Sequence, residues 1–480
     1  MTENQLRFKM ALGCNRFQKA SAVLAVVLAC VLCAPCAARS HRYAAQLESA
    51  TAAAEEEAQW FIQRLDHFNG AEARVWKQRY FVNDTFYRPG GPVFLMIGGE
   101  GPANPAWMQY GTWLLYAQKL GALCLLLEHR FYGKSHPRDP PKERKKERKK
   151  ERWRHEMHVF CLLEESQSSP SVWLDDVNDS MSVDADVKLC DCGLSCKYLE
   201  VVWRSLAAEN PECPLVVKKA SDTLVERLND PKTYDNITKD FRLCSKLQIQ
   251  SKMDSAYLLE SLAGNFMDVV QYNEDNRAFE GVVGTNITIK VLCSVMLDSS
   301  LGEPYDRYAA VARLMQNTFS QACINTQYKS YIQDMSNTSW SGPEAGGGRQ
   351  WVYQTCTEFG FYQSTDSPNQ PFSGFPLHYH LQQCADIYNL STSLDDAIQQ
   401  TNEEYGGYDI RTTRIVFPNG SIDPWHALGV TRDITSDLLA VFIKGTAHCA
   451  NMYPARAEDL PQLSLARDHI FIMLQKWLAE

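Results

Sequence analysis

Alternating aromatic and polar residues from Trp60 to Tyr87, with an Asn-Gly turn inside the segment, predict two paired strands. Pro92–Ile97 and Leu123–Leu127 are continuous apolar runs, which is the pattern of strands buried on both faces. Between them, Pro105–Leu120 has helical spacing, and Gly121 stands where a helix C-cap is expected. The order of strand, helix and strand predicts a parallel sheet with a crossover connection.

From about Leu206 to Gln400 the pattern becomes helical, with apolar residues spaced by three and four. We expect a mostly helical insertion, in which the three glycines of Glu344–Arg349 form a flexible loop. Short apolar runs that predict strands occur again at Ile415–Phe417 and Leu438–Ile443. An amphipathic helix then ends the chain, with one stripe formed by Ile470, Leu474, Trp477 and Leu478. This order predicts an α/β sheet interrupted by a helical cap domain.

The first 38 residues have the pattern of a secretory signal peptide. A basic start precedes the apolar run Ala22–Ala34, and small residues follow up to Ala38. The run is too short to span a bilayer, and a signal anchor is the alternative interpretation. We expect no membrane span in the mature chain. Cleavage would remove four of the 16 cysteines and leave twelve in an oxidising compartment, where disulfides form.

Charge narrows the possible partners. The 480 residues include 57 acidic and 48 basic side chains, a formal charge of −9, which argues against a nucleic-acid partner. Only Lys142–Arg154 departs from this balance, with nine basic and three acidic residues in a Lys-Glu-Arg-Lys repeat. Such a repeat has nothing to bury, so a solvated helix or coil is expected. A basic patch for nucleic acid or anionic lipid is the alternative.

Seven Asn-x-Ser/Thr sequons agree with secretion as a set. Five of them are predicted glycosylation acceptors: Asn83, Asn236, Asn286, Asn337 and Asn389. The other two are Asn178 and Asn419.

Two strand-end loops near the C-terminus hold candidate catalytic residues. Asp423 follows the predicted strand Ile415–Phe417, and His448 follows the predicted strand Leu438–Ile443. In open α/β sheets, loops at the carboxyl ends of strands build the site. An acid and then a histidine on successive loops form the late half of a hydrolase triad, whose chain order is Ser, Asp, His. A turn aspartate and an ordinary buried histidine form the competing interpretation.

Six motifs occur in an order that resembles one peptidase family: Arg64–Asn69, Gly98–Gly101, Glu128–Gly133, Tyr353–Gly360, Asn419–Trp425 and Gly445–His448. The family is that of lysosomal Pro-X carboxypeptidase and dipeptidyl peptidase II, which are serine exopeptidases. The Thr357–Phe361 stretch looks closest to its thymus-specific serine protease branch. The resemblance implies an α/β-hydrolase sheet with a helical cap, peptide substrates, no metal or organic cofactor, and a lysosomal, endosomal or secreted location.

Carried over by motif, the resemblance makes Asp423 the triad acid and His448 the triad base, with Trp425 lining the pocket beside the acid. Gly98 and Gly99 follow an early strand, where hydrolases place an oxyanion-hole donor. The resemblance also implies three disulfides in the cap: Cys213–Cys293, Cys244–Cys323 and Cys356–Cys384.

The chain departs from the family at the nucleophile. No Gly-x-Ser-x-Gly occurs in the sequence, and the two nearest matches, around Ser135 and Ser195, lack the closing glycine. In hydrolases the nucleophilic serine lies on a tight strand-to-helix turn, the nucleophile elbow. The stretch expected to hold this elbow contains the charged repeat and an aperiodic, serine-rich segment. Its cysteines at 190, 192 and 196 have no second ligand pair at zinc spacing, so no metal site is predicted. We interpret 141–197 as an aberrant segment from a transcript or gene model that skips the elbow, with a genuine lineage-specific variant as the alternative.

The predicted organisation is therefore a signal peptide over 1–38, hydrolase parts over 60–140 and 410–480, and a cap over 206–400. The expected function at family level is hydrolysis of peptides by a serine exopeptidase. Without the elbow, this chain is expected to be inactive as written. The competing class is a non-catalytic secreted glycoprotein, or a mis-predicted gene product, that keeps only the cap and part of the hydrolase fold.

Overall fold

The computed structural model of the chain describes residues 25–29, 58–67, 69–137, 172–174, 197–390 and 394–480. Within these residues eight strands form one sheet in the order β2-β3-β5-β4-β1-β6-β7-β8. The strands are β1 Ala25–Ala29, β2 Gln59–Arg64, β3 Val75–Asn83, β4 Val93–Ile97, β5 Leu123–Leu127, β6 Val172–Leu174, β7 Ile415–Gly420 and β8 Leu438–Ile443. Strands β2 and β3 pair antiparallel, and so do β3 and β5, whereas all the other pairs are parallel. The predicted hairpin and the parallel pair β4–β5 are both confirmed.

Two adjacent interior strands of the sheet come from segments in which the sequence predicted no strand. Strand β1 lies inside the predicted signal peptide and pairs with β4 on one side and β6 on the other. Strand β6 lies inside the segment interpreted as aberrant and pairs with β7. The rest of both segments, including the charged repeat, Ser195, Asn178 and the cysteines at 190, 192 and 196, lies outside the described residues.

The helix predicted over Pro105–Leu120 is two elements. A short 3₁₀ helix, η3 Pro105–Met108, is followed by α3 Thr112–Leu120. The break falls at Gly111, whose φ of 106° lies in a region that favours glycine. Gly121 caps α3 in the left-handed conformation, as expected from its position.

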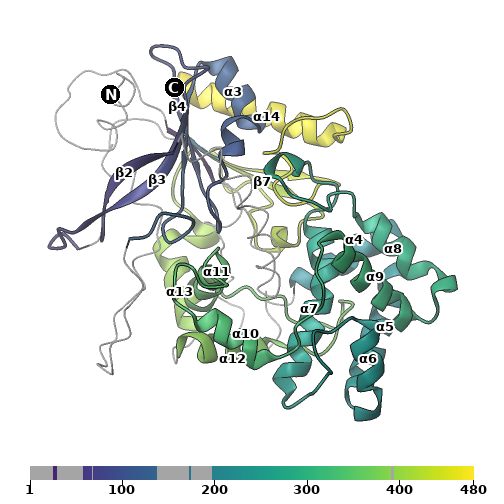
Figure 1. Cartoon of the computed structure of the whole chain (residues 1–480). Helices are drawn as coiled ribbons and strands as arrows, with labels where there is room; N and C mark the ends of the chain where they lie inside the picture. The colour runs from purple at the N-terminus through teal and green to yellow at the C-terminus, as the bar shows by residue number, and fades with distance from the viewer. Residues whose placement is uncertain (1–24, 30–57, 68, 138–171, 175–196, 391–393) are drawn as a thin grey trace.

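The C-terminal helix α14 Pro461–Ala479 forms as predicted and buries Ile470, Leu474 and Trp477. Helices α3 and α14 cover one face of the sheet (Figure 1), and the Tyr116 hydroxyl of α3 donates to the Arg467 carbonyl of α14 at 2.8 Å. Apolar residues of β4, β5, β7 and β8 pack beneath these two helices.

The residues from Lys197 to Tyr405 form what we call the helical region. Its α-helices are α4 Lys197–Glu209, α5 Glu212–Leu228, α6 Tyr234–Asp240, α7 Lys252–Gln271, α8 Ile289–Leu297, α9 Pro304–Thr318, α10 Tyr328–Ser336, α11 Gly348–Gln354, α12 Leu377–Tyr388 and α13 Leu394–Tyr405. They enclose a large apolar core of their own on one side of the sheet (Figure 1). Disulfides join Cys213 to Cys293, Cys244 to Cys323 and Cys356 to Cys384, the same three pairs that the resemblance implies.

The loop predicted at Glu344–Arg349 is present only over residues 344–347, which form turns. Gly348 begins α11, and Glu344 is buried. Gly347 packs directly on the Gly98–Gly101 loop, because a Cβ atom there would lie 2.2 Å from the Glu100 carbonyl oxygen. The glycines therefore permit a close approach of two backbones instead of providing mobility. Among the described helices, none is both long and apolar enough to cross a membrane.

Candidate active site

The two candidate loops meet at the carboxyl ends of neighbouring parallel strands, β7 and β8. The Ile422 amide donates to the Thr446 carbonyl at 2.9 Å and joins the loops directly. Gly420 allows this approach, because a Cβ atom at that position would lie 2.5 Å from the Ala447 carbonyl oxygen. Any larger residue there would push the two loops apart.

This packing brings Asp423 and His448 into contact. The distance between Asp423 Oδ2 and His448 Nδ1 is 2.8 Å, and the two side chains are only 2% and 1% exposed. The other carboxylate oxygen of Asp423 accepts the Trp425 amide at 3.0 Å, as the N-cap of the short 3₁₀ helix η11 Pro424–Ala427. The acid is thus fixed by its own turn, and it orients the imidazole by accepting from Nδ1.

The helical region supplies a third support, which the sequence analysis missed. The His448 amide donates to the carbonyl of Gln271, the last residue of α7, at 2.9 Å. The ring of Tyr272 meets the His448 ring edge to face, with centroids 5.9 Å apart. The Gln271 side chain in turn accepts from the Tyr198 hydroxyl of α4 at 2.7 Å. Residues so far apart in the chain carry no local signal of this contact.

The segment after α7 contains two buried carboxyl groups, and one of them, Asp275, interacts electrostatically with Asp423 and His448. Burial raises the pKa of Asp275 well above its usual range, and the positive charges of Arg277 and His448 oppose this effect. Among the described residues, the Oδ2 atom of Asp275 is buried and has no hydrogen-bond partner. Burial likewise raises the pKa of Glu280 to about 7, although its carboxylate accepts from the Trp107 indole at 2.8 Å. Burial therefore favours the neutral form of both acids.

Gly98, the first residue of the glycine loop after β4, does not have the predicted role of an oxyanion-hole donor. The Gly98 amide donates to the Leu127 carbonyl at 2.7 Å, at the end of the neighbouring strand β5. A donor already used inside the sheet is not available to a substrate oxyanion. The prediction for Gly98 is therefore wrong in its role as a donor, and the residue instead joins its loop to β5.

The buried carboxylate of Glu128 holds together the chain segments around this loop. Glu128, fully buried, pairs with the Arg79 guanidinium and accepts the amides of Ala103 at 3.0 Å and Lys134 at 2.7 Å. It also accepts the Ser135 hydroxyl at 2.9 Å, and that hydroxyl accepts the Arg79 amide at 2.9 Å. Ser135 is therefore a buried structural residue and not a nucleophile.

Trp425 lies in an aromatic cluster next to the acid. Its ring is 3% exposed and packs among Tyr198, Trp351 and Phe361, with centroids 5.2 to 5.7 Å away. The physical reason is that η11 is drawn into the apolar core of the helical region. Trp425 therefore anchors the acid loop to that region, and its role as a pocket residue stays a prediction.

Exposure separates the sequons. Four asparagines are exposed: Asn236, Asn286, Asn337 and Asn389. By contrast, the side-chain amide of Asn83 donates to the Met108 carbonyl at 2.6 Å, and Asn419 is buried with bonds to Phe417 and Val430. Asn83 is thus disfavoured as a glycan acceptor.

Within the described residues, no cluster of His, Cys, Asp and Glu could hold a metal ion.

Comparisons with known proteins identify the family of this chain. A profile of the serine carboxypeptidase S28 family matches residues 63–147 and 179–470. The chain is 33% identical to the thymus-specific serine protease of Mus musculus, with 88% of this chain and 87% of that protein covered. It is 32% identical to a serine protease of Caenorhabditis elegans, with 87% of each covered, and 23% identical to human lysosomal Pro-X carboxypeptidase, with 88% of each covered. The chain therefore belongs to the serine carboxypeptidase S28 family of serine peptidases, which have the α/β-hydrolase fold.

Proposed function

We propose that this chain carries the acid–base half of a serine exopeptidase site, in which Asp423 is the acid and His448 the base. The observation that carries the proposal is the buried 2.8 Å contact between Asp423 Oδ2 and His448 Nδ1 at the ends of two adjacent parallel strands. In a triad, the acid stabilises the imidazolium that forms when the base takes the nucleophile's proton. The helical region would act as the cap, because it contributes Gln271 and Tyr272 to the support of His448.

The substrate class proposed for the family site is peptides, with a preference near proline that rests on the resemblance and the Pro-X carboxypeptidase relatives. Three disulfides support a secretory or lysosomal location, since they form in oxidising compartments. The Gly99 amide is the candidate oxyanion donor that remains in the loop after β4, because Gly98 is engaged with β5.

We further propose that the nucleophile is missing from this chain. The family profile is interrupted at 148–178, between the Glu128–Gly133 motif and the helical region, where the elbow is expected. In the sheet, the position beside β4 is filled by β1, and no serine follows it before Ser40. Loss of the elbow removes both the serine and the oxyanion-hole amide of the residue after it. Removing a triad serine costs about six decades in turnover, so peptide hydrolysis should be near background.

The test is labelling of the full chain with a fluorophosphonate probe, which reacts with activated serines. The unmodified chain should remain unlabelled. Insertion of a family-type elbow, with its strand and helix, between Asp139 and Lys197 should restore labelling, and His448→Ala in that protein should abolish it. Stoichiometric labelling of one serine in the unmodified chain would overturn the proposal.

A non-catalytic glycoprotein that binds peptides is the second candidate, favoured by the absence of Gly-x-Ser-x-Gly. Calorimetric titration of the unmodified chain with proline-containing peptides separates the two. Saturable binding without turnover would support this candidate. An absence of binding would leave the chain as a peptidase scaffold without function at this site.

A further inference from the structure

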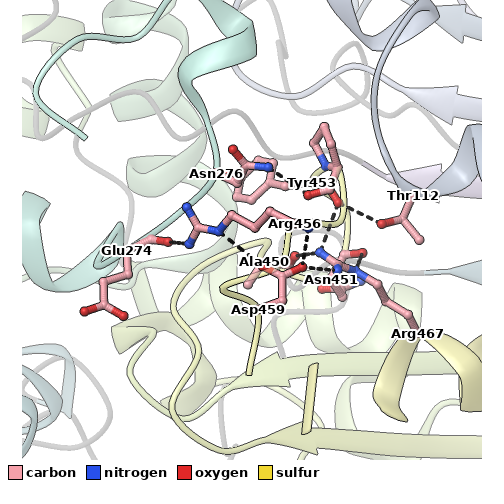
Figure 2. A network of polar contacts seen from close by, with 10 residues as sticks. Thr112, Glu274, Asn276, Ala450, Asn451, Tyr453, Arg456, Asp459 and Arg467 are labelled. Carbon is pink, nitrogen blue, oxygen red and sulfur yellow. Dashed lines mark hydrogen bonds and ion pairs between the residues drawn. The ribbon is translucent and has the colours of Figure 1, made fainter. Parts of the chain in front are cut away.

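The turn that follows His448 has an unusual set of hydrogen bonds (Figure 2). Five consecutive carbonyl oxygens, those of residues 450–454, each accept a hydrogen bond from another part of the fold. The donors come from α14, from the start of α3 and from the loop after α7. A turn whose carbonyls are all held from outside has little freedom to move.

Arg467 of α14 provides three of these six bonds. The residue is 6% exposed, and its guanidinium donates to the carbonyls of Ala450 at 2.8 Å, Asn451 at 3.1 Å and Tyr453 at 3.0 Å. The remaining nitrogen, Nη1, lies 2.5 Å from Asp459 Oδ2, which balances the buried charge. Only the planar fork of arginine can serve three carbonyls and a carboxylate together, so lysine is not an equivalent replacement.

The start of α3 completes this side of the turn. The Thr112 amide donates to the Met452 carbonyl at 2.8 Å, and its hydroxyl donates to the Tyr453 carbonyl at 2.7 Å. The Thr112 amide is one of the orphan donors of a helix N-terminus, and the turn satisfies it.

The helical region holds the turn from the other side. The Asn276 amide donates to the Pro454 carbonyl at 2.8 Å, and the Arg456 guanidinium donates to the Glu274 carbonyl. Arg456 also reaches Asp459 at 3.3 Å, so this carboxylate is shared by the two arginines (Figure 2). We call the groups that hold residues 450–454 the clamp. Its two sides, Arg467 with Thr112 and Asn276 with Arg456, are joined through the Asp459 carboxylate.

Between the clamped turn and the imidazole stands a single residue. Cys449 has a φ of 58°, in the left-handed region that residues other than glycine rarely adopt. Such a conformation persists only where its surroundings fix it, and the hydrogen bonds to residues 450–454 are part of those surroundings. Movement of the turn would be transmitted directly to the imidazole and to its contact with Asp423.

We propose that Arg467 is a positioning residue for His448, acting through the turn 450–454. The proposal rests on the assignment of His448 as the base. Through Asp459 and Arg456 the same clamp couples the histidine to the loop after α7, so a shift of the helical region would reorient the base.

The test uses the full 480-residue chain, produced without secretory cleavage and with labelled histidine. The Nδ1 proton of His448 is followed by nuclear magnetic resonance and identified by its loss in His448→Ala. In Arg467→Lys this proton should exchange with water at least about tenfold faster, because the ring leaves Asp423 more often. The matched control is Leu474→Ala, which creates a cavity under the same helix and removes no hydrogen bond to the turn. It should lower the unfolding midpoint and leave the Nδ1 proton protected.

Two further variants keep the test decisive if Arg467→Lys does not fold. Asp459→Asn and Thr112→Val each remove only part of the clamp and should accelerate the exchange to a smaller extent. Equal exchange in the clamp variants and in Leu474→Ala would show that Arg467 merely anchors α14, and would overturn the proposal. None of these readouts requires a nucleophile, so they remain distinguishable from the outcome of the fluorophosphonate labelling.

Discussion

The helical region and the sheet are built in opposite ways. The helical region comes from one stretch of the chain, Lys197–Tyr405, and its disulfides close loops with sequence separations of 80, 79 and 28. The sheet is assembled from segments that run from Ala25 to Ile443, and two adjacent interior strands, β1 and β6, have only five and three residues. A contiguous, cross-linked unit can form from its own contacts, whereas the sheet depends on the loop closures of distant segments.

The most severe test of this contrast is removal of the predicted signal peptide. A chain that starts after Ala38 lacks β1, so the edges of β4 and β6 face each other without a partner strand. Amide exchange should then show protected backbone in α5, α7 and α9 but none in β4. The full chain, produced without cleavage, is the control. A secreted, monomeric sample that unfolds in one sharp transition, with β4 protected, would contradict the prediction.

Within the sheet, the largest single-residue effect is expected at Glu128. Glu128→Gln replaces an acceptor-only group with one that presents an NH₂ to several donors, and it leaves the Arg79 charge buried and unpaired. Breaking a buried pair in this way costs about 3–5 kcal/mol. Denaturant unfolding of the full chain should show the loss in the transition that reports on the sheet. As a control, Asp235→Asn removes an exposed pair with Lys246 and should have no measurable effect.

The sequence anticipated the parts of the fold that carry a local signal. The buried runs Val93–Ile97 and Leu123–Leu127 formed strands, since short continuous apolar segments suit a sheet that is covered on both faces. The Asp423–His448 contact followed from strand-end loops and the order of the motifs. The family itself was recognised from those motifs.

The remainder of the site could not be predicted, because it depends on contacts between distant segments. Nothing in the local sequence shows that the Gly98 amide is used by Leu127, or that Trp425 is drawn into the helical core. The predicted helix breaks at Gly111 because this residue has a positive φ in the folded chain. The helical spacing of the apolar residues does not reveal such a break. The support of His448 by Gln271 and by the Arg467 clamp is long-range for the same reason.

In the helical region, the disulfides give the next largest effects. Replacement of Cys213 and Cys293 by serine should destabilise the region by about 2–4 kcal/mol, since the bridge closes a loop with a separation of 80. The pair Cys356–Cys384 closes a separation of 28, so its loss should cost about 1 kcal/mol less. Non-reducing peptide maps give the pairing, and thermal unfolding gives the difference. Free thiols at these positions in the secreted protein would contradict the assignment.

The smallest effect concerns two buried titratable groups of the helical region. Burial raises the pKa of Glu260 from 4.5 to about 7 and lowers the pKa of His380 from 6.5 to about 4. His380 Nδ1 lies 3.7 Å from the Glu260 carboxylate, which also accepts from the Tyr379 hydroxyl at 2.7 Å. For Glu260 the folded state binds its proton more tightly, so this contribution is complete below pH 4.5 and is lost as the pH rises through 7. For His380 the folded state favours the neutral ring, so that contribution is complete above pH 6.5 and is lost as the pH falls through 4.

The two contributions have opposite slopes between pH 4.5 and 6.5, and the region should therefore have a nearly constant stability in this window. Glu260→Gln should leave the histidine slope alone, so that the free energy of unfolding, relative to the unmodified chain, increases with pH across the window. His380→Gln should give the opposite sign. Each slope is limited to about 1.4 kcal/mol per pH unit, the value for one proton. Urea unfolding of both variants over this pH range measures the slopes, and slopes of the same sign would show that the pKa values of the two groups do not shift in opposite directions on folding. Glu128→Gln in the sheet should leave the pH profile of the helical region unchanged, because the two units hold separate buried charges.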